Sequence, residues 1–150
     1  MDTVDSANAD IVPRAGYSKT LSEIQEGGFC PFCEENLAIH HDKPILATSS
    51  HWIVTENKLP YAGTRHHFLL ISRRHTEKFA DLASEEIVDF FNQCALLERE
   101  YNLTGMTLLW RSGSTLITGA TVVHLHAHLI IGNERTDTSA PITALVGFSV

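Results

Sequence analysis

The feature that most constrains the fold is a segment in which histidines alternate with aliphatic residues. Residues 123–130 read Val-His-Leu-His-Ala-His-Leu-Ile, which places three of the nine histidines at positions 124, 126 and 128. Side chains alternate between the faces of a β-strand, so residues spaced by two line one face at intervals of about 7 Å. The spacing predicts a strand with His124, His126 and His128 on one face and the aliphatic residues buried on the other.

Length and net charge limit the classes to which the protein can belong. At 150 residues the chain is long enough for one domain with a core and too short for two. With 11 Lys and Arg against 18 Asp and Glu, the net charge of −7 argues against a nucleic-acid-binding surface, although it does not exclude small anionic ligands. The sequence has neither a membrane-spanning apolar run nor the pattern of a secretion signal. We therefore expect a soluble cytoplasmic protein with no membrane partner.

The residue pattern predicts a disordered tail and then one domain. Residues 1–15 have the low hydrophobicity of a disordered segment, and the domain is expected over residues 16–150. A short helix is expected over residues 18–26 and a long one begins after Ser84 as its N-cap. Strands are expected over residues 45–48, 51–55, 67–72, 106–111, 121–131 and, as an edge strand, 142–150. Short links between most strands predict an α+β fold, a mostly antiparallel sheet of about five strands with the long helix on one face.

The histidine row has three interpretations. The imidazoles could decorate a solvated face, but three in succession would each need hydrogen-bond partners if even partly buried. They could form a three-histidine metal site, yet the nearest downstream carboxylate, Glu134, lies beyond Gly132 and too far along the chain for a cupin-like site. The third interpretation is covalent catalysis, in which one neutral imidazole attacks phosphorus while its neighbours orient the phosphate and protonate the leaving group.

The third interpretation coincides with a family resemblance. Residues 124–130, His-Leu-His-Ala-His-Leu-Ile, resemble the signature of the histidine triad nucleotide hydrolases and transferases, in which three histidines alternate with hydrophobic residues. The resemblance covers about residues 29–132. It implies the fold of that family and activity on a nucleotide.

Other segments resemble the family in the same order along the chain. His67 opens a hydrophobic strand that ends at Arg73-Arg74-His75, and the resemblance makes it a fourth active-site histidine. Asn57 lies in a loop that resembles the ribose-binding segment, although an asparagine here also suits a turn. Thr121 precedes the triad and keeps a hydroxyl that the resemblance assigns to phosphate binding.

Two positions depart from the family pattern. Ala120 stands where many members carry a glutamine that contacts the phosphate near the scissile bond, so the leaving-group chemistry of this chain is open. Branches that transfer nucleotides or phosphorolyse dinucleoside polyphosphates can also lack that glutamine. The turn at residues 110–113, Trp-Arg-Ser-Gly, replaces the asparagine-containing sequence common in the family, and the guanidinium of Arg111 could contact phosphate or pair with a surface carboxylate.

The resemblance implies a mechanism without a catalytic metal. His126 attacks the α-phosphorus of a nucleoside phosphoramidate or dinucleoside polyphosphate and forms a nucleotidyl-histidine that water, phosphate or another acceptor resolves. His128 and His67 orient the phosphate and assist the leaving group. The alternative is a zinc-stabilised nucleotide-binding module with little turnover.

Cys30-Pro31-Phe32-Cys33 supplies half of a tetrahedral zinc site. Cys30, Cys33, His75 and His124 match the ligand pattern of the zinc-bearing members of the family, and four protein ligands would make the site structural. A reduced thiol pair and a thioredoxin-like redox motif are the alternatives, and the second lacks its usual βαβ setting. Other candidate ligands are His40, His41 and His51, each of which also suits a surface or core position.

The resemblance also suggests a homodimer joined through the long helix and the adjoining strand. The apolar positions of that helix equally suit a monomer core. Residues 133–150 carry no recognisable motif. The nucleobase, the number of phosphates and the acceptor are not determined by the sequence.

Overall fold

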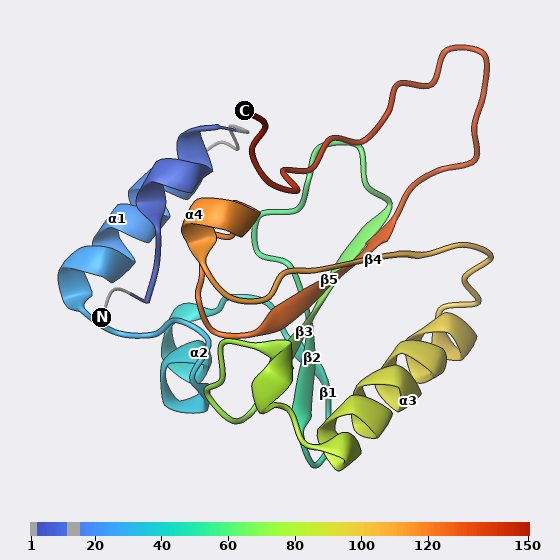
Figure 1. Ribbon diagram of the computed structural model, residues 1–150. Coiled ribbons are helices and arrows are strands. Elements are labelled where there is room, and N and C mark those ends of the chain that lie inside the picture. Colours follow the sequence, from blue (N-terminus) through green and yellow to red (C-terminus); the bar gives the residue numbers. More distant parts are fainter. Residues whose placement is uncertain (1–2, 12–15) are drawn as a thin grey trace.

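A five-stranded antiparallel sheet forms the centre of the computed structural model, which describes residues 3–11 and 16–150 (Figure 1). The strand order is β1-β2-β3-β5-β4, and each neighbouring pair is antiparallel. The strands are β1 Ile45–Thr48, β2 Trp52–Glu56, β3 His66–Ser72, β4 Thr107–Trp110 and β5 His126–Ile131. The α+β fold predicted from the sequence is confirmed.

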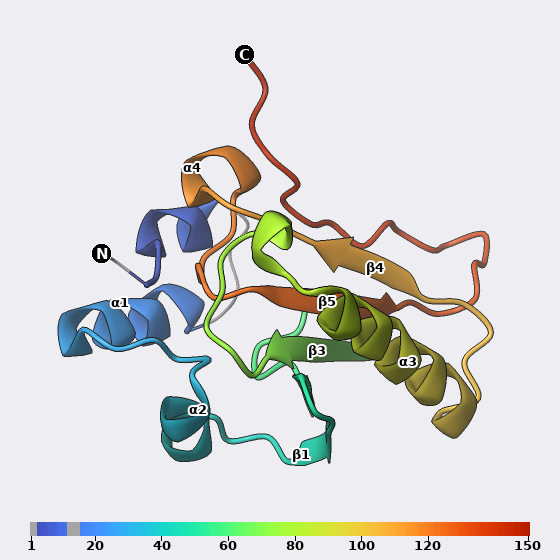
Figure 2. The same ribbon diagram turned by 60° about the horizontal axis from the view of Figure 1, so that its bottom comes forward.

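Helices cover the two faces of the sheet unequally (Figure 2). The long helix α3, Ser84–Glu100, packs on one face, while the opposite face carries the shorter α1 and α2. The remaining helices are α1 Tyr17–Gly27, α2 Glu34–His40, the single turn α4 Thr115–Thr118, and the 3-10 helices η1 Ser6–Asp10 and η2 Phe79–Asp81.

The main core lies between α3 and the sheet. Phe90 of α3 stacks on Trp110 with ring centroids 4.0 Å apart, and Ala127 and Leu129 of β5 are completely buried beneath the helix. Burial of a large apolar side chain stabilises a fold by about 1.5–3 kcal/mol. This packing holds the alternating strand rigid, so residues on its other face are held in fixed positions.

The start of α3 differs from the expected one by a single residue. The structure places Ala83 at the N-cap and Ser84 inside the helix. Alanine has no side-chain oxygen, so the Glu86 carboxylate accepts the Ala83 N–H at 2.8 Å instead. Arg74 donates two hydrogen bonds to the same carboxylate and holds the pKa of Glu86 below its ordinary value.

The two ends of the chain differ most from the expectations. Residues 3–11, expected within a disordered tail, are instead packed: Val4 forms a bridge with Val122, and both are buried with Leu21 of α1. Residues 1–2 and 12–15 of that expected tail lie outside the described residues. The predicted edge strand over residues 142–150 is wrong, because this segment forms neither helix nor strand and returns toward α4 (Figure 1).

Candidate active site and metal cluster

The strand register places two of the three histidines of the triad on the face opposite α3. His128 pairs with Leu69 and His126 pairs with Ile71 across β3, while the alternate residue Ala127 points into the α3 core. His124 lies before the first residue of β5 rather than within it. The predicted single row therefore holds for His126 and His128, whose ring centroids are 5.0 Å apart, and ends before His124.

A backbone carbonyl determines which nitrogen of His126 is available for chemistry. The Nδ1 atom lies 2.7 Å from the carbonyl oxygen of His124, and only a protonated Nδ1 can donate to that acceptor. Neutral His126 then carries its lone pair on Nε2. Burial lowers the pKa of His126 to about 4, and the nearby Arg111 contributes in the same direction. His126 is therefore a neutral imidazole at physiological pH, with Nε2 able to act as a nucleophile.

His67 and His128 form a second imidazole pair. The Tyr61 N–H donates to His67 Nδ1 at 3.1 Å, so the proton of a neutral His67 is on Nε2. That Nε2 lies 2.8 Å from His128 Nδ1 and donates to it, which leaves the proton of a neutral His128 on its own Nε2. Both side chains are buried. The pair therefore presents the Nε2–H of His128 as a hydrogen-bond donor to a bound group.

His124 belongs to a separate cluster. Its Nε2 donates to the carbonyl oxygen of Ser72 at 2.6 Å, which leaves the lone pair on Nδ1. That Nδ1 faces two thiols, at 3.4 Å from Cys30 Sγ and 3.8 Å from Cys33 Sγ. His75 Nδ1 completes the group at 3.4 Å from Cys33 Sγ. Residues far apart in sequence thus present four donor atoms to one point.

The donor atoms of this cluster fit a tetrahedral metal ion. All four ligand atoms of Cys30, Cys33, His75 and His124 lie within 4.8 Å of one another. Zinc bonded to sulfur and nitrogen in a tetrahedron separates neighbouring ligand atoms by about 3.5 Å, which agrees with the observed contacts. The other ring nitrogens of both histidines face oxygen atoms, of the Ser72 carbonyl and the Glu77 carboxylate, as metal-bound histidines usually do.

The chemistry of the thiols does not favour the redox alternative. Burial, with Cys30 beside it, raises the pKa of the Cys33 thiol to about 12. Reactive redox cysteines have the opposite property, a lowered pKa near a helix N-terminus or a cation. A divalent cation would supply the positive charge that converts both thiols to thiolate ligands.

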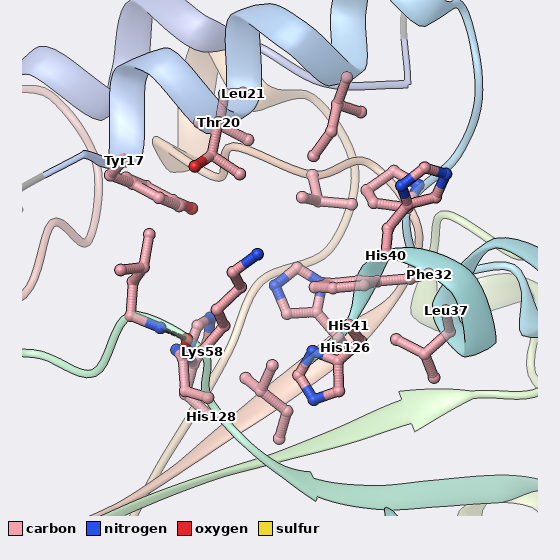
Figure 3. A pocket seen from close by; sticks show the side chains of 16 residues that line it. Tyr17, Thr20, Leu21, Phe32, Leu37, His40, His41, Lys58, His126 and His128 are labelled. Atoms are coloured by element: carbon pink, nitrogen blue, oxygen red, sulfur yellow. Dashed lines mark hydrogen bonds between the residues drawn. The ribbon is translucent and has the colours of Figure 1, made fainter. Parts of the chain in front are cut away.

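An apolar pocket opens beside His126 and His128. Helix α1 forms one wall through Tyr17, Leu21 and Ile24, and the base is formed by β3 and β5 (Figure 3). We call this the apolar pocket; its volume is about 90 Å³. It is lined by Tyr17, Thr20, Leu21, Ile24, Pro31, Phe32, Leu37, His40, His41, Asn57, Lys58, Leu59, Leu69, Val122, His126 and His128.

A smaller and more polar cavity lies on the other side of the same two histidines. We call it the polar chamber; its volume is about 30 Å³. It is lined by Asn8, Ala9, Tyr17, Tyr61, Arg111, Gly119, Thr121, His126, His128, Ala144 and Leu145. The predicted phosphate contacts Thr121 and Arg111 both belong to it. The Thr121 hydroxyl is hydrogen-bonded to the Tyr17 hydroxyl, and Arg111 donates to the carbonyl oxygen of Leu145 rather than to a carboxylate.

The remaining predicted positions fall around these cavities. Asn57 lies in the apolar pocket with its Nδ2 atom 3.1 Å from His67 Nε2, and its Oδ1 accepts the Leu59 N–H, so it also stabilises the turn. Ala120 is buried, and its carbonyl oxygen accepts a hydrogen bond from the Asn8 amide at 2.8 Å. Asn8 thus brings an amide into the polar chamber next to the position where the family glutamine is missing.

The other histidines stay out of the catalytic group. His66 stacks on Phe68 on the α3 side of the sheet, because side chains alternate between the two faces along β3. His41 is hydrogen-bonded to Thr55, and His40 stacks on Phe29 at the edge of the apolar pocket. Neither of these two histidines belongs to the cysteine cluster, and the same is true of His51.

Sequence reasoning missed several residues of the site. Tyr61 fixes the tautomer of His67 through its backbone N–H, a role that its residue type does not reveal. Tyr17 and Asn8 come from the amino-terminal segment, and Ala144 and Leu145 from the carboxy-terminal one. Only the folding of both ends onto the sheet brings them to the histidines, so no local motif could have identified them.

Helices that could cross a membrane are not found in the part of the chain that the structure describes.

Comparison with protein families matches residues 36–135 to the HIT domain, two thirds of the chain. No curated protein sequence matches the chain. Among solved structures, a HIT family hydrolase from Legionella pneumophila Philadelphia 1 is 21% identical, with a TM-score of 0.58 over 73% of this chain and 98% of that one. A histidine triad nucleotide-binding protein from Candida albicans is 19% identical, with a TM-score of 0.59 over 77% of this chain and 85% of that one.

The diadenosine triphosphate hydrolase of Plasmodium falciparum, solved in complex with Cyclomarin A, is also similar. It is 25% identical, with a TM-score of 0.50 over 67% of this chain and 65% of that one. The region matched to the HIT domain, residues 36–135, contains the histidine strand β5 and its partner β3. It begins after Cys30 and Cys33 and ends before Ala144 and Leu145.

Proposed function

The chain belongs to the HIT domain family, and from this premise we propose that it is a nucleotide hydrolase or nucleotidyltransferase acting at the α-phosphorus of its substrate. The observation that carries the proposal is the orientation of His126. Its Nδ1 donates to the His124 carbonyl and its pKa is lowered to about 4, so a neutral Nε2 is available as the nucleophile.

The two cavities indicate the orientation in which the substrate binds. The nucleoside occupies the apolar pocket, where Asn57 is the proposed ligand of the ribose hydroxyls. The α-phosphate lies against His126 and His128, which line both cavities, with Thr121 and Arg111 as donors to its oxygens. Substrates of this shape include nucleoside phosphoramidates and dinucleoside polyphosphates, and one structural neighbour is by name a hydrolase of diadenosine triphosphate.

The proposed reaction has two steps. In the first, the bond between His126 Nε2 and phosphorus forms while the bond from phosphorus to the leaving group breaks; the leaving group departs with the bonding electron pair, accepts a hydrogen bond from the Nε2–H of His128 and takes its proton from water. His67 supports His128 through their hydrogen bond. In the second, water or another acceptor attacks the nucleotidyl-histidine, loses its proton to solvent and releases His126 as a neutral imidazole. Donors fixed around the phosphate stabilise the charge that develops in both steps.

A structural zinc ion is the proposed occupant of the cluster formed by Cys30, Cys33, His75 and His124. Zinc would supply a cross-link between the segment that follows α1 and the residues that precede β5, and it would take no part in the bond-making steps. The proposed location is the cytoplasm, where reducing conditions keep the thiols available to a metal.

A homodimer is the proposed assembly. Helix α3 exposes Ile87, Val88 and Phe91 to the extent of 41%, 61% and 55%, and Leu108 of the edge strand β4 is 39% exposed on the same side of the sheet. A second copy could cover this apolar surface and pair with β4. Phe91→Asp should convert a dimer to a monomer in light scattering, whereas Phe148→Asp, at an exposed residue of the carboxy-terminal segment, should not. A monomeric unmodified chain would refute the dimer.

The experiment that tests the enzyme proposal measures product from adenosine 5′-phosphoramidate and from diadenosine polyphosphates. The unmodified chain should release adenosine monophosphate, His126→Ala should not, and His66→Ala should behave as the unmodified chain because His66 lies on the α3 side. Nucleotide binding without His126-dependent product would support the alternative, a zinc-stabilised nucleotide-binding module.

A further inference from the structure

The leaving group has a compartment of its own. His126 and His128 line both the apolar pocket and the polar chamber, so a phosphorus atom at His126 has one substituent directed to each side. If the nucleoside occupies the apolar pocket, as the proposed function requires, the group that leaves phosphorus enters the polar chamber. What the chamber admits therefore decides which substrates react.

Part of the wall of the polar chamber comes from segments outside the HIT match. Thr121, Tyr61 and the two histidines lie within residues 36–135, whereas the amino-terminal segment contributes Asn8, Ala9 and Tyr17 and the carboxy-terminal segment contributes Ala144 and Leu145. The family region thus supplies the reacting groups. The two ends of this chain supply the shape of the compartment beside them.

The carboxy-terminal segment packs against a glycine that a larger residue could not replace. A side chain at Gly119 would lie 2.5 Å from the Leu145 side chain, so Leu145 could not approach a larger residue there. Ile142 lies against Gly63 and Gly132, where an added Cβ would be at ordinary contact distances of 3.7 Å and 3.4 Å. The segment contains neither helix nor strand, so it can be displaced without breaking the sheet.

Arg111 is held by this segment. Its Nε donates to the Leu145 carbonyl at 3.2 Å, and its Nη2 donates to the same oxygen. The guanidinium has a planar fork of donors that suits phosphate oxygens, and it is the arginine that lines the chamber. A packed tail therefore occupies donors that a phosphate would use, and it reduces the free space to about 30 Å³, enough for a water molecule or a group of similar size.

We propose that residues 142–146 are a displaceable wall of the leaving-group compartment, and that their displacement admits phosphate-bearing leaving groups and frees Arg111 to bind them. With the wall in place, the chamber accepts a small leaving group such as the ammonia of a nucleoside phosphoramidate. With the wall displaced, it accepts the nucleotide that leaves a dinucleoside polyphosphate. In each case the bond from His126 to phosphorus forms as the bond to the leaving group breaks, and the Nε2–H of His128 donates a hydrogen bond to the leaving group.

The proposal is tested with two truncated chains. One ends at Pro141 and lacks the wall; the matched control ends at Val146 and keeps the contacts of Leu145 and Arg111. Removal of residues 142–150 should raise kcat/KM for a diadenosine polyphosphate, relative to adenosine 5′-phosphoramidate, by at least about tenfold. The chain ending at Val146 should keep the ratio of the full chain. Circular dichroism and thermal melting establish that both truncated chains are folded.

Arg111 provides the second arm. In the chain that ends at Pro141, Arg111→Gln should lower kcat/KM for the polyphosphate about tenfold more than for the phosphoramidate and so return their ratio to that of the full chain, while Arg111→Lys should keep part of the gain because the charge remains. A loss of equal size for both substrates would show that Arg111 acts on the α-phosphate alone, and it would overturn its assignment to the leaving group.

A binding measurement separates this proposal from the proposed function. Calorimetry on His126→Asn, in the full and the shortened chain, compares adenosine diphosphate with adenosine monophosphate, and the preference for the diphosphate should rise about tenfold on truncation. An equal substrate ratio in all chains, with turnover intact, would overturn the displaceable wall alone. Truncation-dependent diphosphate binding without turnover would overturn the proposed function alone, and absence of both effects would overturn both.

Discussion

His124 and His126 lie two residues apart, are both buried, and donate a ring N–H to a backbone carbonyl, yet they present opposite nitrogens. His124 donates through Nε2 to Ser72 and presents Nδ1 to the thiols, whereas His126 donates through Nδ1 to His124 and presents Nε2 to the cavities. Their environments otherwise agree, since burial lowers the pKa of both to about 4. The difference teaches that the backbone acceptor selects the reactive nitrogen, and thereby separates a metal ligand from a nucleophile.

The largest expected effect comes from replacing His126 or His124 by alanine, each in a separate variant. His126→Ala should lower turnover by at least about a thousandfold and leave one zinc per chain, because it removes the nucleophile and no ligand. His124→Ala should lose the zinc and keep turnover within about tenfold, because its backbone carbonyl still orients His126. Steady-state kinetics and elemental analysis check both. Equal losses of turnover would mean that the two imidazoles act as one unit.

Loss of a metal ligand should lower the stability of the folded chain more than its turnover. Cys33→Ser should abolish stoichiometric zinc and lower Tm by about 10 °C, since a bound metal stabilises the folded chain. Cys94→Ala is the control, because Cys94 is a buried thiol of the α3 core away from the cluster. It should leave zinc content unchanged. Full zinc content in Cys33→Ser would remove Cys33 from the ligand set.

The pKa of His126 predicts a stability that falls in acid. The unfolded chain takes up the proton near pH 6.5 and the folded chain only near pH 4, so the folded state loses stability as the pH falls between these values and not above them. The expected loss for this one group is about 3 kcal/mol. Urea unfolding at pH 7 and pH 4.5 should show a smaller loss for His126→Ala than for His66→Ala. An identical loss in the two variants would contradict the neutral His126.

Replacing either of two asparagines should give the smallest and most selective effects. Asn57 contacts His67 beside the apolar pocket, and Asn36 donates to the carbonyl of Cys30 at 2.8 Å. Asn57→Ala should raise KM about tenfold with zinc affinity unchanged, whereas Asn36→Ala should weaken zinc about tenfold with KM unchanged. Kinetics and competition with a chelator measure the two effects. A raised KM in both variants would mean that the cluster and the pocket are not independent.

The strands and the long helix could be predicted because their side chains repeat at the period of the element. The alternation around His126 and the apolar spacing of Phe90 and Leu97 carry that information locally. Helix α2 was not predicted, since its seven residues bury only Leu37 and show no apolar repeat. The apolar residues after Pro141 suggested an edge strand, but they pack against Gly63, Gly119 and Gly132 instead of pairing with a strand.

The residue types of the candidate site could be predicted from the sequence, but the ring tautomers and the cavity walls could not. The spacing of the histidines and the cysteine pair indicated two kinds of chemistry, and the structure brings the four proposed metal ligands together. The tautomers depend on acceptors such as the Ser72 carbonyl, which tertiary packing places. The walls from Asn8 and Leu145 depend on both ends of the chain folding back, and polar composition alone could not show that Val4 packs on Val122.

The most direct test of the central claim is to capture the covalent intermediate. The zinc-loaded chain is mixed with a nucleoside phosphoramidate, quenched in alkali within one turnover, and digested for mass spectrometry, because a phosphorus–nitrogen bond to histidine survives base better than acid. The nucleotide should be found on His126 and not on His124. Product formation with no adduct at His126, or an adduct on His124, would contradict the division of roles between the two imidazoles.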